Sequence, residues 1–585
     1  MIKIFKNLKA KEWVLIAVSL VFIVAQVWLD LKLPDYMSEI TTLVQTPNSE
    51  MQDILVAGGY MLLCALGSLA TSFIVAGIAS KIAANFSARL RLKLFDKVQA
   101  FSMEEINNFS TASLITRTTN DVTQIQMFIV MGLQMLVKAP ILAVWAMLKI
   151  MDKSWQWTLS TGVAVLVLFI IVGICIIIAL PKFKRIQYLT DNLNRITREN
   201  VTGTRVIRAY NAENYQEAKF TKANNELTHN NLYTNSVMAS LMPSISLIMS
   251  GLSLAIYWVG ALLLSEADIQ SRMTIFSDMI VFSSYAIQVV MAFMMLIIIF
   301  ILMPRAVVSA KRINEVLDTA PLIKNGAAQV SPVGVSGEIE FKNVSFKYSD
   351  SDDYVLHDIS FKANRGETIA FIGATGCGKS TLINLIPRFY DVSEGEILVD
   401  DMNVKDFDSQ ALRNKIGYIS QKACLFEGSV QSNIAFGDNG KHSADIHDVM
   451  DAVSIAQASD FVENMEDSYE AHIAQGGTNL SGGQKQRLSI ARAIARRPEI
   501  LIFDDSFSAL DYKTDRKLRS VLKKETKGTT LLIVAQRIGT IKDADKIIVL
   551  EEGRIVGMGT HSELIENCDV YQEIAYSQLS KEELA

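Results

Sequence analysis

Residues 368–380 read Thr-Ile-Ala-Phe-Ile-Gly-Ala-Thr-Gly-Cys-Gly-Lys-Ser, and this stretch decides the fold of the second half of the chain. Its first part, Thr368–Phe371, has the composition of a buried strand. The pattern G-x-x-x-x-G-K-S follows from Gly373 to Ser380, and an apolar helix is predicted from Thr381 onward. Strand, glycine-rich loop and helix in this order are the context in which the pattern forms a phosphate-binding loop. The second half is therefore predicted to be an α/β P-loop domain.

The loop also carries the chemistry expected of this domain. Its glycines allow backbone N–H groups to point at phosphate oxygens, and the N-terminus of the next helix favours an anion. Lys379 is expected to reach the β- and γ-phosphates, and the Ser380 hydroxyl to coordinate Mg²⁺. Cys377 fits the loop as a small neutral residue. The sequence thus predicts a site for ATP or GTP with Mg²⁺, formed by Gly373, Gly376, Cys377, Gly378, Lys379, Ser380 and Thr381.

A second apolar strand, Ile500–Phe503, ends in Asp504. A carboxylate at the end of this strand can hold the Mg²⁺ shell, which completes the nucleotide site. Asp504 and Ser380 are therefore predicted metal ligands.

A second glycine-rich loop lies between these two strands. It reads Leu480-Ser481-Gly482-Gly483-Gln484, and helical spacing of apolar residues follows from Lys485 to Arg497. A glycine-rich loop at a helix N-terminus is a phosphate-binding element. Because the chain has two such elements but only one phosphate loop, the second element is expected to serve a nucleotide held by another chain.

The first half of the chain has the composition of a membrane domain. A membrane-spanning helix needs about 20 mostly apolar residues, and six stretches qualify: Trp13–Leu33, Ile54–Ser80, Met127–Ile150, Trp155–Leu180, Ser236–Leu264 and Thr274–Met303. Lys and Arg gather at the N-terminus and in the second and fourth connecting loops, whereas the other loops carry only Lys32, Lys153 and Arg272. By the positive-inside rule, the N-terminus, the basic loops and the P-loop domain are expected in the cytoplasm, beneath a plasma membrane such as a bacterial inner membrane.

Composition agrees with this division. The chain has 585 residues, of which 50% are hydrophobic and 20% charged, which excludes disordered, collagen-like and disulfide-scaffold proteins. Residues 1–320 hold 27 Lys/Arg and 21 Asp/Glu (+6), and residues 321–585 hold 29 and 40 (−11), which together give the net charge of −5. We expect an all-α six-helix transmembrane domain over residues 1–320, a linker over 321–336 and a nucleotide-binding domain over 337–585. The five cysteines are scattered, without metal-ligand spacing.

The two basic loops keep helical spacing of apolar residues over Phe86–Met103 and Ile186–Tyr210. They are predicted to continue the membrane helices into the cytoplasm as two hairpins. Contact with the P-loop domain is favoured over the alternative that they are solvated connecting helices. Lys138 lies inside the third span and allows two interpretations. It is a functional intramembrane charge, or it lies near the inner interface and extends its ammonium to water.

Leu480–Gln484 matches the signature motif of ATP-binding cassette (ABC) transporters, and six spans followed by one cassette resemble a half-size ABC exporter over nearly the whole chain. The resemblance implies that Tyr348 stacks on adenine and that Gln421 contacts Mg²⁺ and senses the membrane domain. It also implies that two chains enclose two ATP molecules, each between one chain's phosphate loop and the other's signature. The loop linking the two sites would be Ser508, Ala509, Leu510 and Asp511.

Two residues depart from the family pattern in one site. The family has Glu as general base after the strand-ending Asp, and this chain has Asp505. The family also has a His that contacts the γ-phosphate, and this chain has Gln536. The chain thus resembles the degenerate-site subunit of heterodimeric bacterial multidrug exporters. Its own hydrolysis is expected to be impaired, and its signature, Ser481 to Gln484, is expected to complete a competent site on a partner half-transporter with intact Glu and His. The alternative is that Asp505 still acts as a base in a slow homodimer.

The predicted function is ATP-driven export of hydrophobic or amphipathic compounds by alternating access, in contact with membrane lipid. A lipid flippase, a peptide exporter and an ATP-gated regulatory membrane protein are alternatives, of which the peptide exporter is disfavoured. Nucleic acid is not expected as a partner, because the positive-inside rule already accounts for the basic residues.

Overall fold

The computed structural model describes residues 2–46, 49–151, 155–329, 336–437, 439–440 and 444–578. It forms two compact units. The helical unit comprises Met1–Lys97 and Ala112–Thr319, and the α/β unit comprises Val98–Thr111 and Ala320–Ala585. A short segment of the first half of the sequence thus belongs to the α/β unit.

The helical unit contains six segments that are long and apolar enough to cross a membrane, among the described residues: Ala10–Gln45, Met51–Gln99, Thr111–Met151, Trp155–Thr202, Glu213–Glu266 and Arg272–Asp318. Each predicted span lies within one of them, so the prediction of six spans is confirmed. The helices are α1 (Ile2–Phe5), α2 (Ala10–Gln45), α3 (Met51–Gln99), α5 (Thr111–Thr118), α6 (Asn120–Met131), the π-helix η1 (Gly132–Leu136), α7 (Lys138–Met151), α8 (Trp155–Thr202), α9 (Thr204–Ala209), α10 (Glu213–Ala239), α11 (Leu241–Glu266) and α12 (Ile269–Asp318).

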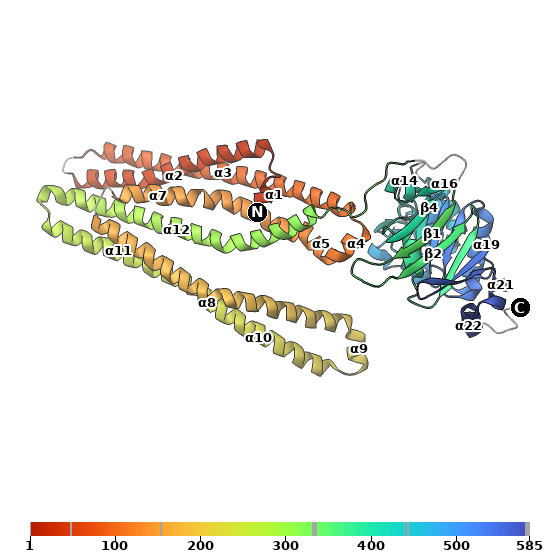
Figure 1. The fold of residues 1–585 in the computed structure, drawn as a ribbon. Helices are drawn as coiled ribbons and strands as arrows, with labels where there is room; N and C mark the ends of the chain where they lie inside the picture. Colours follow the sequence, from red (N-terminus) through yellow and green to blue (C-terminus); the bar gives the residue numbers. More distant parts are fainter. Residues whose placement is uncertain are drawn as a thin grey trace. The chain divides into compact units, whose positions relative to one another are not determined.

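Several of these helices are much longer than a membrane is thick. At about 1.5 Å per residue the 49 residues of α3 extend over roughly 74 Å, against about 30 Å for the hydrocarbon core. The prediction that the membrane helices continue well beyond the spans is therefore confirmed. In Figure 1, α2, α7 and α12 lie side by side, while the second half of α8, with α9 and α10, forms an arm that separates from α7 and α12.

The helical unit is held together by an apolar core between α2, α7, α8, α11 and α12. Its largest side chains include Phe282, Tyr285 and Trp157, which are almost fully buried. The Trp157 indole N–H donates a hydrogen bond to the backbone oxygen of Ile256 over 3.1 Å, so the one polar atom of the ring is satisfied in the core.

The α/β unit is built on a six-stranded sheet with the order β12-β11-β3-β10-β9-β6. Five strands run parallel and β12 is antiparallel. The strands are β3 (Thr368–Gly373), β6 (Ile416–Ile419), β9 (Ile500–Asp504), β10 (Thr530–Val534), β11 (Lys546–Glu551) and β12 (Arg554–Gly559). The two strands predicted at 368–371 and 500–503 are β3 and β9. Every residue of β9 and β10 is buried, which explains why both are continuous apolar runs.

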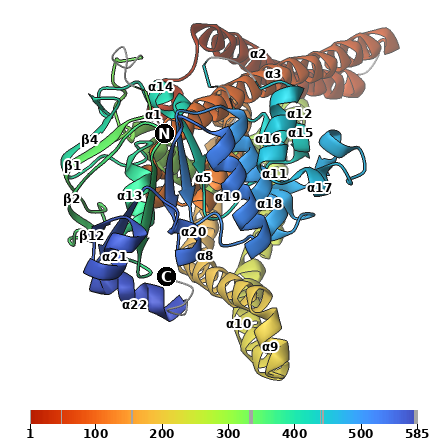
Figure 2. The same ribbon diagram turned by 90° about the vertical axis from the view of Figure 1, so that its right-hand side faces the viewer.

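A four-stranded antiparallel sheet of order β2-β1-β4-β5 belongs to the same unit. Figure 2 shows β1, β2 and β4 on one side of it and α16, α18 and α19 on the other. The remaining strands are β1 (Ile339–Phe346), β2 (Leu356–Ala363), β4 (Glu394–Val399), β5 (Met402–Asn403), β7 (Gly428–Ser429) and β8 (His472–Ile473). The helices are α4 (Met103–Phe109), α13 (Lys379–Leu385), α14 (Ser409–Asn414), α15 (Val430–Ile434), α16 (Ile446–Ile455), α17 (Ser459–Val462), α18 (Gly482–Ala495), α19 (Tyr512–Glu525), α20 (Ile538–Ile541), α21 (His561–Asn567) and α22 (Asp569–Gln578), with short 3-10 turns at Ser468–Glu470 and Gln475–Gly477. The predicted fold class, a six-span helical domain plus an α/β P-loop domain, is confirmed.

Helix α4, at the turn of the first predicted hairpin, packs within the α/β unit. The Glu105 carboxylate accepts a hydrogen bond from the backbone N–H of Leu322 over 2.6 Å. The Asn107 amide lies 3.4 Å from the Tyr390 hydroxyl and donates to it. Burial alone would raise the pKa of the Glu105 carboxyl, but hydrogen bonds from Ser102 and from the Leu322 N–H outweigh it and lower that pKa. The first hairpin thus reaches the P-loop domain, whereas contact of the second hairpin stays a prediction.

Candidate nucleotide site

Four loops that leave the carboxyl ends of parallel strands form the candidate site. The strands β3, β10, β9 and β6 are consecutive neighbours in the sheet, so their carboxyl ends meet at one edge. Ligands of parallel α/β sheets bind at this edge. It brings together the phosphate loop after β3, Gln421 after β6, Asp504 and Asp505 at the end of β9, and Gln536 after β10.

The backbone of the phosphate loop (Gly373–Ser380) depends on its glycines. Gly376 and Gly378 have φ angles of +89° and +97°, in the region that favours glycine. At Gly378 a Cβ would also lie 2.8 Å from a methyl group of Leu356, so a side chain here would strain the backbone and require Leu356 to shift. Gly378 is also the N-cap of α13, which directs the first N–H groups of that helix toward the loop.

Lys379 lies folded inside the loop that it belongs to. Its ammonium donates to the backbone oxygens of Gly373 and Ala374, each over 2.8 Å. The thiol of Cys377 lies 3.5 Å from the same ammonium and is buried. A buried lysine whose ammonium is held by two carbonyl oxygens at the centre of a glycine-rich loop fits the phosphate-binding role predicted for it.

Ser380 and Asp504, the predicted metal ligands, face one another. The Ser380 hydroxyl donates to Asp504 Oδ1 over 2.7 Å. Burial raises the pKa of the Asp504 carboxyl, and hydrogen bonds from Ser380 and Tyr418 act against this rise. No cluster of three or more His, Cys, Asp or Glu suited to a metal occurs among the described residues. Mg²⁺ bound beside phosphates takes only one or two protein carboxylates, so a hydroxyl and a carboxylate at this spacing fit that ion.

Asp505, the residue at the general-base position, is held by two amides on one oxygen. Gln536 Nε2 donates to Asp505 Oδ2 over 3.0 Å, and Gln421 Nε2 contacts the same oxygen at 3.3 Å. The Gln421 amide nitrogen is thus directed to Asp505. Contact of Gln421 with the metal stays a prediction. Burial raises the pKa of the Asp505 carboxyl, the Gln421 hydrogen bond lowers it, and the neighbouring Asp504 charge raises it. Asp505 also has a φ angle of +46°, which is uncommon outside glycine.

Two further residues support this site. The Tyr418 hydroxyl donates to Asn384 Oδ1 over 2.9 Å and lies 3.4 Å from Asp504 Oδ2. At the other end, the Gln578 amide donates to the backbone oxygen of Gln536 over 2.7 Å, so the last residue of α22 holds the Gln536 backbone. Sequence reasoning missed both. Tyr418 could have been found because it lies near the end of β6, three residues before Gln421, whereas nothing in the sequence points to Gln578.

Tyr348, the predicted adenine-stacking residue, is close to the phosphate loop. Its hydroxyl lies 3.0 Å from the Thr381 hydroxyl. Its ring meets the rings of Phe346 and Tyr390 edge-to-face, at centroid distances of 4.9 and 5.3 Å. The half-buried ring is thus fixed in orientation next to α13.

The signature (Leu480–Gln484) forms the start of α18. Ser481 is the N-cap, and its hydroxyl accepts from the Gln484 N–H while Gln484 Oε1 accepts from the Ser481 N–H. This reciprocal capping box presents the glycines at the helix N-terminus. A Cβ on Gly483 would lie 3.3 Å from the backbone oxygen of Ala509, so the signature adjoins the Ser508–Asp511 loop.

That loop in turn adjoins Asp505, because the Ser508 hydroxyl donates to the Asp505 backbone oxygen over 2.8 Å. At its other end Asp511 caps α19 by accepting from the Thr514 N–H over 2.9 Å. Within the part of the chain that the structure describes, no hydrogen bond or ion pair joins the signature to the phosphate loop.

Comparison with known proteins agrees with this geometry. Residues 15–293 match the family model of the ABC transporter transmembrane region, and residues 356–508 match that of the ABC transporter. An uncharacterised ABC transporter ATP-binding protein of Mycobacterium tuberculosis is 37% identical over 521 residues, which covers 89% of this chain and 87% of the relative. The putative multidrug export ATP-binding/permease protein YgaD of Bacillus subtilis is 32% identical over 507 residues, which covers 83% and 82%.

A solved structure of a bacterial Atm1-family ABC exporter with ATP bound has the same fold. Its TM-score is 0.79 at 22% sequence identity, and the match covers 96% of this chain and 97% of that one. Two family models, relatives above 30% identity over most of their length and a shared fold all give the same assignment. The chain belongs to the ABC transporter family and is a half-transporter, a multi-pass membrane protein with six spans and one ATP-binding cassette.

Proposed function

We propose that this half-transporter is the degenerate-site subunit of an unequal pair that exports hydrophobic or amphipathic compounds. The observation that carries the proposal is the arrangement at Asp505. Its carboxylate has one methylene fewer than the glutamate of the family pattern, and Gln536 and Gln421 both donate to its Oδ2. A general base must reach the attacking water, and a misplacement of about 1 Å costs on the order of 100-fold in rate.

Gln536 cannot supply the positive charge that a histidine at this position can carry. A neutral amide donates hydrogen bonds but carries no positive charge toward a phosphate, and here it is already used on Asp505. The same site otherwise keeps the groups that bind nucleotide: the phosphate loop, Lys379 and the Ser380–Asp504 pair. Bound Mg²⁺ would neutralise phosphate charge there. A site that binds ATP firmly and hydrolyses it slowly follows from this combination.

The signature has no such defect. Ser481 and Gln484 form a complete capping box, and the glycines at the start of α18 leave the helix N-terminus open to an anion. We propose that this element completes the hydrolytic site on a partner half-transporter that has the missing Glu and His. The Ser508–Asp511 loop lies between the signature and Asp505 and thus connects the two sites.

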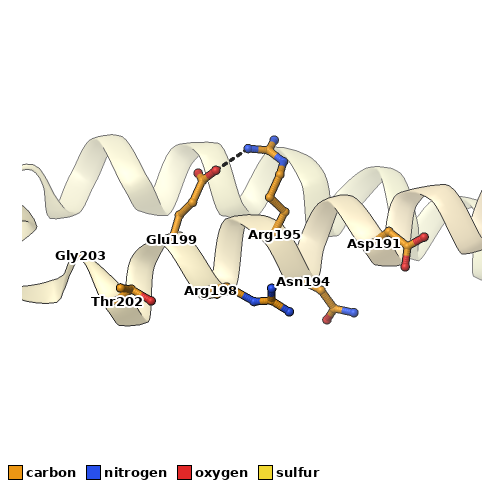
Figure 3. A pocket seen from close by; sticks show the side chains of 7 residues that line it. All are labelled: Asp191, Asn194, Arg195, Arg198, Glu199, Thr202 and Gly203. Carbon is orange, nitrogen blue, oxygen red and sulfur yellow. Dashed lines mark hydrogen bonds and ion pairs between the residues drawn. The ribbon is translucent and has the colours of Figure 1, made fainter. Parts of the chain in front are cut away.

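A second chain is also favoured by the arm of the helical unit, which we define as residues 186–239. An open groove of about 690 Å³ follows one face of α8 on this arm, lined by Asp191, Asn194, Arg195, Arg198, Glu199, Thr202 and Gly203 (Figure 3). At its tip Val201, Tyr210 and Tyr215 expose 71%, 79% and 70% of their surface. Exposed aromatic and aliphatic side chains at the tip of a long hairpin mark a surface for another protein.

Within the arm, α8 packs along α10. Arg195 and Lys219 both pair with Glu199, at 2.6 and 3.0 Å, and the second pair joins α8 to α10. We propose that this arm is the second coupling hairpin, that it transmits cassette movement to the spans, and that the N-terminus and cassette lie in the cytoplasm. Cargo export of a multidrug type is favoured by the name of the B. subtilis relative.

The test uses the full chain purified alone and co-purified with the half-transporter encoded beside its gene. We expect ATP binding by the lone chain, little hydrolysis, and strong hydrolysis by the pair. Robust ATPase activity of the lone chain that Asp505→Asn abolishes would overturn the proposal in favour of a slow homodimer. Uptake of a hydrophobic dye into inverted vesicles, dependent on hydrolysis, separates export from an ATP-gated regulatory role.

A further inference from the structure

Charged side chains lie along α2 and α7, from within the predicted spans at Asp30 and Lys138 to the outer ends of those spans at Lys32, Asp35 and Lys149. We define this charged seam as Asp30, Lys32 and Asp35 on α2 with Lys138 and Lys149 on α7. Ionisable residues inside membrane spans are rare, and they line substrate or ion pathways far more often than lipid. Lys138 also lies two residues after the end of η1, and single π-helical turns within α-helices are frequent at functional sites.

One part of the charged seam is a closed pair. Lys138 Nζ lies 3.0 Å from Asp30 Oδ2, which shows that Lys138 is paired within the bundle. The Ser68 hydroxyl donates to the other oxygen of Asp30. Gln288 on α12 donates to the Asp30 backbone oxygen over 3.4 Å. Each charge of this pair therefore has a partner of opposite sign.

The other part holds one carboxylate and two ammonium groups. Lys149 lies 3.0 Å from Asp35 Oδ2, and Lys32 lies 3.4 Å from the same oxygen. The Tyr285 hydroxyl also contacts Asp35, through Oδ1. One carboxylate cannot neutralise two ammonium groups, so the charged seam has three positive and two negative charges and an excess of one positive charge.

The charged seam is partly accessible from outside the protomer. The exposed fractions of its side chains are 18% and 25% for the Lys138–Asp30 pair and 37% and 30% for Lys149 and Asp35. Charges in contact with hydrocarbon are strongly unfavourable. An exposed side that avoids hydrocarbon is open to water, and in the proposed function the path of the cargo between two half-transporters is one place where water reaches these side chains.

We propose that the charged seam binds the anionic head group of an amphiphilic cargo, with Lys149 and Lys32 as the recognising residues. This inference rests on the proposed export function and specifies its cargo class. A cationic head group could reach Asp35 or Asp30 only by displacing a lysine already bound there. An anionic head group, such as a carboxylate, can take the ammonium that Asp35 shares, so it gains a charge-assisted hydrogen bond without leaving a buried charge unpaired.

The experiment measures equilibrium binding to the full-length chain in nanodiscs, without ATP, by fluorescence anisotropy. Three fluorescent probes share one alkyl tail and differ in the head group: carboxylate, neutral amide or trimethylammonium. We expect the carboxylate probe to bind most tightly. Lys149→Gln should weaken its binding about tenfold, while the amide probe, which reports that the variant is folded, should change little.

Two matched variants locate the effect. Lys11→Gln removes a positive charge from the exposed start of α2, outside the charged seam, and should leave all three affinities unchanged. Asp30→Asn combined with Lys138→Gln removes one charge of each sign and should retain the preference for the carboxylate probe. Tighter binding of the cationic probe, equal binding of all three, no binding, or an unchanged carboxylate affinity in Lys149→Gln would overturn the inference. A separate transport assay tests the proposed function. If the probes bind but do not accumulate in inverted vesicles with ATP, the proposed export function fails while the binding inference stands.

Discussion

Gln536 and Asp505 are joined by a hydrogen bond of 3.0 Å at the two positions where the family pattern has a histidine and a glutamate. The two departures are therefore one structural change, because the amide of one residue is used to hold the carboxylate of the other. The side-chain amide of Gln421, in the same chain, also donates to this carboxylate and further restrains it.

Restoring the glutamate alone should restore hydrolysis only in part. Asp505→Glu returns the missing methylene but leaves Gln536 on the carboxylate, whereas Asp505→Glu with Gln536→His returns both groups. We expect ATPase activity of the double variant to exceed that of the unchanged chain by about 100-fold, with Asp505→Glu between them. A phosphate-release assay on the purified chain with its partner, in which the partner's own glutamate is replaced by glutamine, isolates this site. Equal activity of all three proteins would contradict the account.

Ser481 should act on the partner's ATP and not on the chain's own. Ser481→Ala should lower ATPase activity of the pair by at least about tenfold, because it removes a hydroxyl from the phosphate-facing helix N-terminus. The alanine also removes an N-cap, which is worth about 1 kcal/mol. Ser481→Asn keeps a good N-cap without the hydroxyl, so it separates the two effects. A loss of ATP binding by the lone chain, measured with a fluorescent nucleotide, would argue against this role.

Asp504 should make the nucleotide-free cassette less stable near neutral pH. Burial raises the pKa of its carboxyl, so the folded state binds a proton more readily than the unfolded state does. Stability then falls as pH rises from the ordinary pKa of 3.8 through the raised value, and the loss is complete above it. Asp504→Asn should therefore raise the melting temperature without nucleotide at about pH 7, with a smaller gain at about pH 5. A gain in melting temperature that becomes larger as the pH is lowered would contradict this prediction.

Glu105 should show the opposite dependence. Hydrogen bonds from Ser102 and from Leu322 N–H lower the pKa of its carboxyl, so its contribution is present above the ordinary pKa of 4.5 and is lost as pH falls through the lowered value. Glu105→Gln weakens a charge-assisted hydrogen bond worth about 1.5–3 kcal/mol. We expect a lower melting temperature at about pH 7. The adjacent Glu104→Gln is the control, since it removes the same charge from a half-buried position on the same helix, and it should melt like the unchanged chain.

The meeting of the predicted site residues at one edge of the sheet follows from the sequence, because these residues lie at or just after the ends of apolar strands. Asp504 ends β9 and Gln536 comes two residues after β10, and the parallel sheet order then places them together. The phosphate loop can also be predicted from the sequence, since positive φ angles at Gly376 and Gly378 favour glycine at these positions.

Contacts between segments far apart in the chain could not be predicted in the same way. Gln578 reaches Gln536 across 42 positions, and Asp30 reaches Lys138 across more than 100. No local pattern records which helix face meets which, because a polar residue in an apolar helix has the same sequence context whether it is paired or directed to an interface. For this reason the sequence alone does not predict the ion pair between Lys138 and Asp30.

The capping box of Ser481 and Gln484 has a consequence for what the closure of two half-transporters costs in entropy. Because both N–H groups at this helix start already have acceptors within the chain, the signature is formed before any nucleotide arrives. Binding to a preorganised surface avoids the entropy loss of ordering a loop. Closure of two half-transporters then needs no ordering of this loop, so we expect nucleotide to leave the hydrogen-exchange protection of the N–H groups of Ser481 and Gln484 nearly unchanged in the lone chain.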